Sequence, residues 1–241
     1  MTDAVNFADP IKTKSKLLRP RDAATLLIVD RSGPVPTVLM GRRHMRHKFM
    51  PGKYVFPGGR VEPYDGRMPC VGELGESHAT RLAMHLRRVS EQRMRGFALA
   101  AIRETCEETG ILLGRKTDAA PRAPHESWKA FEDAGVVPDL SGLQFVARAI
   151  TPPGRPRRFD ARFFVADANL IAHQIDGIIT PDSELDALVW IPVSEAKTLD
   201  LPNITQIVVG ELAKRIEANF DPAIPVPFIR MINKKSVRSE L

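Results

Sequence analysis

Three glutamates lie within five residues of one another, directly ahead of a glycine, in the stretch RETCEETGI that spans residues 103–111. On a helix that turns by about 100° per residue, Glu107 lies about 300° and Glu108 about 40° around the axis from Glu104. Three carboxylates therefore share one face, where like charges repel by on the order of a few tenths of a kcal/mol per pair. The stretch predicts a helix with a strongly anionic side.

The opposite side of the same helix is apolar. Leu99, Ile102 and Cys106 fall at about 220°, about 160° and about 200° from Glu104, which gives the helix a face for a hydrophobic core. On the anionic face, a divalent cation such as Mg²⁺ would remove the repulsion, because hard cations prefer carboxylate oxygens. The alternative is a face that is merely solvated, since glutamate-rich helix faces are common.

A Pro-Gly-Gly break upstream favours a ligand site over a solvated face. The β-type run of residues 53–56 meets Pro57, Gly58 and Gly59. Paired glycines let a backbone turn sharply and approach a ligand closely. We therefore expect Gly58 and Gly59 to contribute to ligand binding.

The glycine turn and the glutamate helix together resemble the Nudix hydrolase family. The sequence box of that family reads glycine, five residues, glutamate, seven residues, and then Arg-Glu-aliphatic-x-Glu-Glu-x-Gly-aliphatic. The first glycine of the box matches Gly59, and its second half matches Arg103, Glu104, Glu107, Glu108, Gly110 and Ile111. The resemblance covers roughly residues 20–215.

The match departs from the box at three points. The first acid of the box falls on Asp65 rather than on a glutamate, and the aliphatic position holds Thr105. Residues 66–102 separate Asp65 from Arg103, which makes 37 residues where the box has seven. About 30 residues are therefore inserted inside the box.

An insertion at this point of the box resembles one branch of the family, the peroxisomal coenzyme A diphosphatases. That branch carries a long insertion at this point, and the chain also resembles it in residues 49–52, 55–59 and 158–164. Ser77 is suited to cap a helix from His78 to Arg88, so we expect a helical insertion. The insertion could shape the substrate pocket or a dimer contact. The alternative is that it lies outside the site and has no part in it.

The resemblance implies a site that uses Mg²⁺ or Mn²⁺. Glu104 and Glu108 are the first candidates for metal ligands, and Glu107 completes the site or binds a second ion. The carbonyl of Gly59 is a further candidate ligand, as in the family. We expect Arg103 to orient a carboxylate rather than to touch substrate.

Two further groups of residues complete the candidate site. Glu184 stands just before an expected strand and is an alternative to the box glutamates as general base. The basic loop of residues 41–52 runs directly into the glycine turn, so we expect Arg42, Arg43 or Arg46 to grip a phosphate with its planar fork. The alternative is a solvated loop whose charge serves solubility.

The composition limits the partners of the chain. Its net charge of +6 and pI of about 9.5 permit a phosphorylated metabolite, a nucleic acid or a membrane surface. Only 6% of residues are aromatic, so stacking platforms for single-stranded nucleic acid are poorly supplied. No apolar run approaches the roughly 18 residues that span a bilayer. We expect a phosphorylated small-molecule substrate and no membrane association; a homodimer is one option for the oligomeric state.

The cysteines and the N-terminus bear on the compartment. The chain has only Cys70 and Cys106, so a disulfide framework is not implied. The N-terminus shows no apolar segment of the secretory kind. A cytoplasmic location follows by elimination.

The order of expected elements predicts an α/β protein with a mixed sheet and helices on both faces, because no regular βαβ period appears. The Nudix fold is an α/β/α sandwich of this kind. We expect strands at residues 24–29, 37–40, 143–150, 159–166 and 187–191, and helices at 78–88, at 90–109 and from Asn203 or Thr205 onward. We divide the chain into a flexible basic arm (1–20), one Nudix domain (21–220) with a helical insertion (66–95), and a Pro-rich and basic tail (221–241).

The resemblance implies metal-dependent hydrolysis of a diphosphate linkage in a nucleoside diphosphate derivative. Coenzyme A or acyl-coenzyme A is the expected substrate. ADP-ribose, NADH and oxidised nucleotides are alternatives, and the high pI also permits an RNA-decapping hydrolase. A binding module that holds a nucleotide without cleaving it is the alternative from a different class, although such domains typically lose box glutamates.

Overall fold

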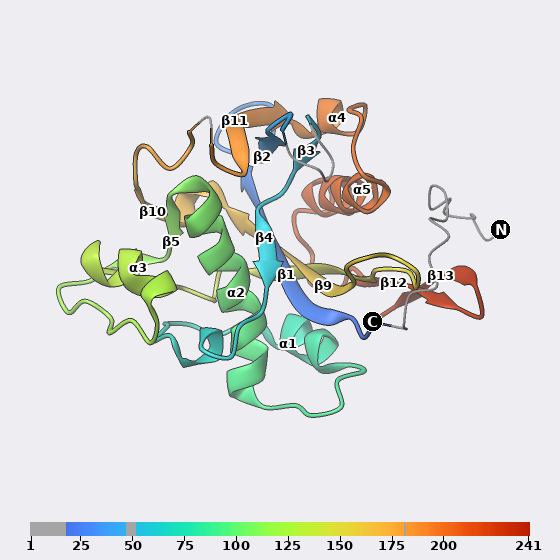
Figure 1. Cartoon of the computed structure of the whole chain (residues 1–241), viewed down its shortest axis with the longest axis horizontal. Coiled ribbons are helices and arrows are strands. Elements are labelled where there is room, and N and C mark those ends of the chain that lie inside the picture. The colour runs from blue at the N-terminus through green and yellow to red at the C-terminus, as the bar shows by residue number, and fades with distance from the viewer. Residues whose placement is uncertain (1–17, 47–51, 181) are drawn as a thin grey trace.

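The computed structural model describes residues 18–46, 52–180 and 182–241. Figure 1 draws these parts as a coloured ribbon. Residues 1–17 of the expected arm and the family-like residues 49–51 lie outside the described residues.

A nine-stranded mixed sheet forms the centre of the molecule (Figure 1). Its strands are β1 (Arg21–Asp30), β2 (Thr37–Arg43), β3 (Tyr54–Val55), β4 (Gly58–Arg60), β8 (Gln144–Ile150), β9 (Phe159–Asp167), β11 (Leu185–Pro192), β12 (Pro227–Ile232) and β13 (Lys235–Glu240). They follow the order β11-β2-β1-β9-β8-β12-β13, with β3 beside β2 and β4 beside β1. The pairs β1–β9 and β8–β12 are parallel, and the other neighbours are antiparallel. Two short antiparallel pairs lie apart from it, β5 (Ile111–Leu113) with β10 (Ile171–Gln174) and β6 (Arg115–Lys116) with β7 (Val136–Val137).

Helices cover both faces of the sheet (Figure 1). On one face lie α1 (Glu76–Ala83) and α2 (Glu91–Thr109), with the short α3 (Lys129–Asp133) at the side of α2; on the other lie α4 (Val193–Ala196) and α5 (Asn203–Glu217). The central strand β1 is apolar on both sides, with Leu26 and Ile28 in the α2 core and Leu27 and Val29 in the α5 core. The predicted α/β fold with a mixed sheet is confirmed. Within the described ranges, no helix combines the length and the apolar character needed to cross a membrane.

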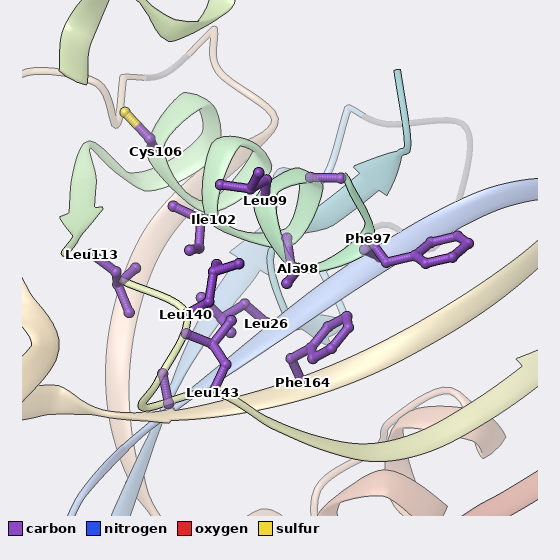
Figure 2. Close-up of a cluster of buried hydrophobic side chains, with 14 of the residues drawn as sticks. Leu26, Phe97, Ala98, Leu99, Ile102, Cys106, Leu113, Leu140, Leu143 and Phe164 are labelled. Atoms are coloured by element: carbon purple, nitrogen blue, oxygen red, sulfur yellow. The ribbon is translucent and has the colours of Figure 1, made fainter. Parts of the chain in front are cut away.

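The glutamate helix α2 begins and ends as the sequence predicts. The side chain of Ser90 accepts a hydrogen bond from the backbone N–H of Arg93, and Gly110 ends the helix in the left-handed conformation at φ 76°. The apolar side of α2 packs on β1 and β9, where Phe97, Leu99 and Ile102 are fully buried (Figure 2). The glutamate side is thereby turned away from the core.

Two sequence predictions about chain organisation are wrong in detail. The insertion contributes one helix that ends at Ala83 rather than Arg88, because Met84 leaves the helical conformation and Val89 is exposed instead of packing. Residues 227–240, expected in a tail, form the hairpin β12–β13 and extend the sheet beside β8. Phe228 and Ile229 at the start of β12 are buried, and no period-2 alternation marks the strand, so the prolines ahead of it dominated the sequence prediction for this segment.

Replacing Gly110 by alanine tests the end of α2. An alanine Cβ would lie 2.3 Å from the carbonyl oxygen of Ile175, at a φ that disfavours side chains. We expect the free energy of unfolding to fall by at least about 1–2 kcal/mol, measured by urea denaturation. Gly210→Ala in α5 is the matched control, because no atom lies within 4 Å of its added Cβ; it should raise stability by about 0.5–1 kcal/mol. Equal effects of the two substitutions would contradict this account of the helix end.

Candidate active site

The three glutamates occupy the last two turns of α2 and differ in their surroundings. Glu107 is exposed, whereas Glu104 and Glu108 are half-buried. Arg103 Nη1 donates to Glu104 Oε1 at 2.8 Å and to Glu107 Oε2 at 2.9 Å. Two of the three acids are therefore paired by a neighbour on their own helix, and Glu108 is not among them.

The glycine turn lies directly against these acids. Strand β4 pairs with β1, so that Gly58 is opposite Thr25 and Gly59 is opposite Ala24. A Cβ at Gly59 would lie within 2.5 Å of the carboxylate atoms of Glu104. Only a glycine lets the backbone come this close to the glutamate.

Glu108 carries the least compensated charge of the three. Burial, the largest effect, raises its pKa well above the ordinary value, and the carboxylates of Glu184 and Glu104 raise it further. The backbone N–H of Gly58 and the cation of Arg43 oppose this rise. Burial likewise raises the pKa of Glu104, against the nearby Arg103 charge. Negative charge has thus gathered between α2, β4 and the start of β11.

Glu184, which the sequence suggested only by its place before a strand, lies at this site. It forms an ion pair with Arg43 at 2.7 Å and acts electrostatically on Glu108. The pairing of β11 with β2 brings it there, because Leu185 is opposite Arg43. An acid 76 positions after Glu108 in the sequence therefore joins the helix acids in space.

The guanidinium of Arg103 forms an ion pair with a buried carboxylate. Its Nε donates to Asp65 Oδ1 at 2.7 Å and its Nη2 to Asp65 Oδ2 at 3.2 Å, with both side chains almost fully buried. Asp65 also accepts from the indole N–H of Trp128 at 3.2 Å and from the backbone N–H of Glu62 at 2.7 Å. These ion pairs raise the pKa of Arg103 although burial alone would lower it. Arg103 is therefore a fixed cation that orients Glu104 and Glu107.

The three arginines predicted to grip a phosphate are each paired with an acid. Arg42 donates to Asp186 at 2.8 Å, and Arg43 is paired with Glu184. Arg46 lies 3.6 Å from Asp182, with both side chains largely exposed. Exposed pairs of this kind contribute little, on the order of 0–1 kcal/mol, so a phosphate could displace the pair at Arg46 most easily.

The donor set suits a hard divalent cation. Among the described residues, no three Asp, Glu, His or Cys side chains are close enough together to form a complete metal site. Carboxylate oxygens are nevertheless the ligands that Mg²⁺ and Mn²⁺ prefer, and burial together with the neighbouring carboxylates of Glu184 and Glu104 raises the pKa of Glu108. The residues at this site therefore fit a divalent cation.

Sequence reasoning missed two residues that shape the site. Asp65 was noted as a departure from the box, but its buried pairing with Arg103 was not foreseen. Trp128 lies at the end of the 3₁₀ turn before α3, and its indole N–H donates to Asp65. A signal for Asp65 existed, because an acid at the box position is a natural partner for Arg103, the basic residue next to Glu104. No signal connected Trp128 to it.

Three known proteins are similar to this chain. A NUDIX hydrolase from Alicyclobacillus acidocaldarius superposes with a TM-score of 0.60 and 28% identity, covering 80% of this chain and 90% of that one. Putative nudix hydrolase 7 of Caenorhabditis elegans is 28% identical over 185 residues, which are 73% of this chain and 52% of that protein. An acyl-coenzyme A diphosphatase of Gallus gallus is 31% identical over 206 residues, which are 60% of this chain and 54% of that protein. The chain thus spans about half the length of these two curated relatives, and no protein-family model matches it.

Asp65→Asn tests the support beneath Arg103. The substitution keeps the shape of the side chain and removes its charge, which leaves a buried guanidinium with less compensation. We expect the free energy of unfolding to fall by about 3 kcal/mol in urea denaturation. Asp182→Asn, at the exposed pair with Arg46, should change it by less than about 1 kcal/mol. An unchanged stability in the Asp65 variant would overturn the role given to this pair.

Alanine at Gly59 should lower turnover, whereas alanine at Gly58 should lower stability. At Gly59 the added Cβ meets the end of the flexible Glu104 side chain, so stability should change little while the carboxylate is displaced. At Gly58 it would meet the backbone oxygen of Ala24 at 2.6 Å, so the strand pairing itself should be strained. We expect Gly59→Ala to lose about 10- to 100-fold in turnover at near-normal unfolding temperature, and Gly58→Ala to lower that temperature. Normal turnover by Gly59→Ala would refute the close contact.

Proposed function

Because the chain belongs to the Nudix hydrolase family, we propose that it hydrolyses a diphosphate linkage in a nucleoside diphosphate derivative, with Mg²⁺ or Mn²⁺ as cofactor. The observation that supports this proposal most directly is the gathering of Glu104, Glu108 and Glu184 against the Gly58–Gly59 turn. Burial, the largest cause, raises the pKa of Glu104 and of Glu108, and the carboxylate of Glu184 raises the pKa of Glu108 further, so negative charge at this place is not compensated by the protein. A phosphate alone would be repelled by these carboxylates. A cation that binds to them would also bind the phosphate, so the two together fit this place better than either alone.

The residues of the chain divide the work in this proposal. Glu104, Glu108 and the carbonyl of Gly59 would hold the cation, with Glu107 as a further ligand. When bound, the cation offsets the charge of the anionic phosphorus centre and lowers the pKa of a bound water. Arg103 fixes the direction of Glu104 through the 2.8 Å contact, so it acts as a positioning residue.

We infer that the general base is a carboxylate of this site that keeps an oxygen free when the cation is bound, because a base must be free to accept a proton. One of the box glutamates is the first candidate. Glu184 is the alternative, since it faces the same site from β11. Arg43 would then hold the Glu184 carboxylate in place.

For the substrate, we infer coenzyme A or an acyl-coenzyme A. The support is the similarity to an acyl-coenzyme A diphosphatase of Gallus gallus, together with the inserted segment inside the box. The exposed guanidinium of Arg46, in its loose pair with Asp182, is the one best placed to turn toward a phosphate. ADP-ribose, NADH and other nucleotides are the competing substrates.

A hydrolysis panel tests the chemistry and the substrate together. Coenzyme A, acetyl-coenzyme A, ADP-ribose, NADH and diadenosine tetraphosphate would be incubated with Mg²⁺ or Mn²⁺, and the products identified by mass. We expect cleavage of coenzyme A at its diphosphate, a loss of at least about 100-fold in kcat for Glu104→Gln, and no turnover after chelation of the metal. Glu217→Gln, at an exposed position on α5, is the matched control and should keep full activity.

The outcomes separate the alternatives. Cleavage of ADP-ribose or NADH but not of coenzyme A would keep the chemistry and discard the inferred substrate. Full activity of Glu104→Gln would overturn the assignment of the metal ligands. Binding of a nucleotide at one equivalent with no metal-dependent product would identify a binding module instead.

A further inference from the structure

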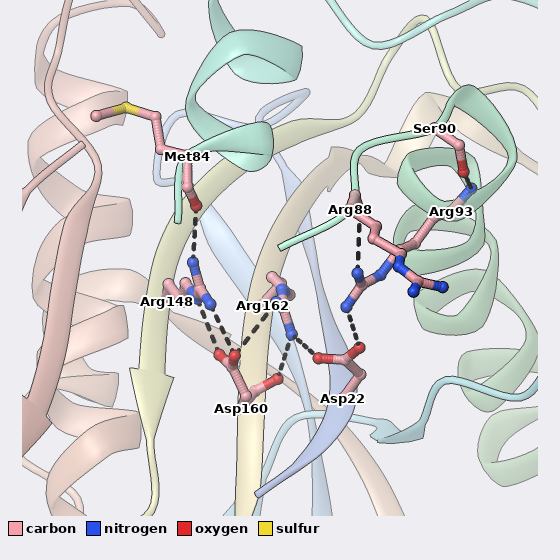
Figure 3. Close-up of polar contacts among 8 residues, drawn as sticks. All are labelled: Asp22, Met84, Arg88, Ser90, Arg93, Arg148, Asp160 and Arg162. Atoms are coloured by element: carbon pink, nitrogen blue, oxygen red, sulfur yellow. Dashed lines mark hydrogen bonds and ion pairs between the residues drawn. The ribbon is translucent and has the colours of Figure 1, made fainter. Parts of the chain in front are cut away.

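An arginine-rich cavity of about 840 Å³ lies at the end of the sheet near α1, away from the glutamates. Its walls come from the starts of β1 and β9, from the end of β8, and from the connection between α1 and α2 (Figure 3). Six arginines and two aspartates line it, so the wall carries an excess of four positive charges. Cavities of about 300–1,000 Å³ are typical of small-molecule sites.

The floor of the cavity continues the face of the sheet that carries the α2 core. Asp22 is opposite Asp160, and Arg162 is opposite Arg148, in the registers of β1–β9 and β8–β9. Because side chains alternate along a strand, these four point to the same side as Leu26. Where the apolar core ends, the sheet thus presents polar side chains.

The two aspartates of the floor are already paired. Asp22 accepts from Arg162 at 2.7 Å and from Arg93 at 3.0 Å, and Asp160 accepts from Arg148 at 2.7 Å (Figure 3). The two aspartates therefore compensate the charge of the arginines that they contact. They do not compensate the positive charge of the other arginines in the wall.

Arg162 is the buried centre of this floor. Its side chain is fully buried, with the guanidinium 4.0 Å from the ring centre of Phe97. Its Nε–H has no hydrogen-bond partner among the described residues, which is costly for a buried charged donor. Burial lowers the pKa of Arg162, and the like charge of Arg148 lowers it further against the pull of Asp160 and Asp22. An anion in the cavity would offset the excess positive charge that Arg162 shares with Arg148.

The rim of the cavity supplies cations that no acid neutralises. Arg19 precedes β1, and Arg87 and Arg88 lie in the connection between α1 and α2. None of these three exposed side chains forms an ion pair within the part of the chain that the structure describes. Guanidinium groups recognise phosphate with paired hydrogen bonds, which makes three of them around one opening suited to a phosphate.

The cavity is separate from the glutamates. Arg93 in its wall and Glu104 lie eleven residues apart on α2, which is about 16 Å along a helix axis. Arg93 lies in the first turn of α2 (Glu91–Thr109), whereas the glutamates lie in its last two turns. A ligand phosphate in the cavity would therefore not be the one that meets the glutamates.

We propose that this cavity is a second anion site, which binds the phosphate group of a small molecule between Arg162 on its floor and Arg19, Arg87 and Arg88 at its rim. The phosphate belongs either to a remote part of the substrate or to a separate ligand. Both sources share the same chemistry, and the second arm of the test distinguishes them.

The first arm measures binding of inorganic pyrophosphate by calorimetry to the whole chain in a chelating buffer, so that the glutamate site lacks its cation. We expect pyrophosphate to bind, and the variant R87Q/R88Q to bind at least about tenfold more weakly, since each charge-assisted hydrogen bond is worth about that factor. R19Q, on another element, should weaken binding in the same direction. The control K116Q/R122Q removes two positive charges outside the cavity and should bind as the unaltered chain does, apart from a small salt-sensitive effect.

Three results would overturn the proposal. They are no binding of pyrophosphate at millimolar concentration, an equal loss of affinity in R87Q/R88Q and in K116Q/R122Q, or undiminished affinity in both the R19Q variant and the R87Q/R88Q variant. None of these measurements depends on hydrolysis, so the proposed function can fail while this site stands. The second arm compares coenzyme A with dephospho-coenzyme A, which lacks one phosphate, as ligands of the metal-free chain. If R87Q/R88Q weakens only coenzyme A, the phosphate is the substrate's own; if it weakens neither but weakens pyrophosphate, the ligand is a separate molecule.

Discussion

The buried contact between Arg103 and Asp65 is the interaction on which the candidate site depends. Arg103 reaches in one direction to a carboxylate with no exposure to solvent and in the other to Glu104 and Glu107. A buried charge of this kind needs each of its partners, because losing one leaves an unpaired charge in a medium of low dielectric. The directions of the site glutamates are therefore set by the interior of the protein rather than by the exposed surface around them.

The sequence predicted the part of the fold and site whose signals are local. The helix over residues 91–109 has a serine cap, an apolar stripe and a terminal glycine, and all three lie in neighbouring residues. The strand 159–167 and the glycine turn are of the same kind. What it did not predict depends on contacts between distant segments: Trp128 reaches Asp65 across 63 positions, and prolines hid the hairpin at 227–240. Glu184 was proposed only from its place before a strand, and the strand pairing that brings it to the glutamates was not visible in the sequence.

The same distinction separates the two groups of arginines. Those at positions 42, 43 and 46 stood out as a basic cluster, yet in the folded protein each faces an acid of the segment 182–186. The arginines around the cavity come from four separate parts of the sequence, and only the fold brings them to one opening. Local charge density along a chain is thus a poor guide to where the folded protein has charge left over.

The segment inserted between Asp65 and Arg103 also has a cost in chain entropy. Closing a flexible loop of 37 residues rather than seven costs about 1.5 kcal/mol more, since the cost grows with the logarithm of length. Here α1 packs Leu82 into the α2 core, and the backbone carbonyl of Met84 accepts from Arg148, so the segment is anchored at its middle. The long closure is thereby divided into shorter ones. If α1, which contacts no residue of the candidate site, frayed, the two shorter loop closures would become one long closure again. The orientation of the glutamates would then be sensitive to temperature and denaturant well before the sheet unfolds.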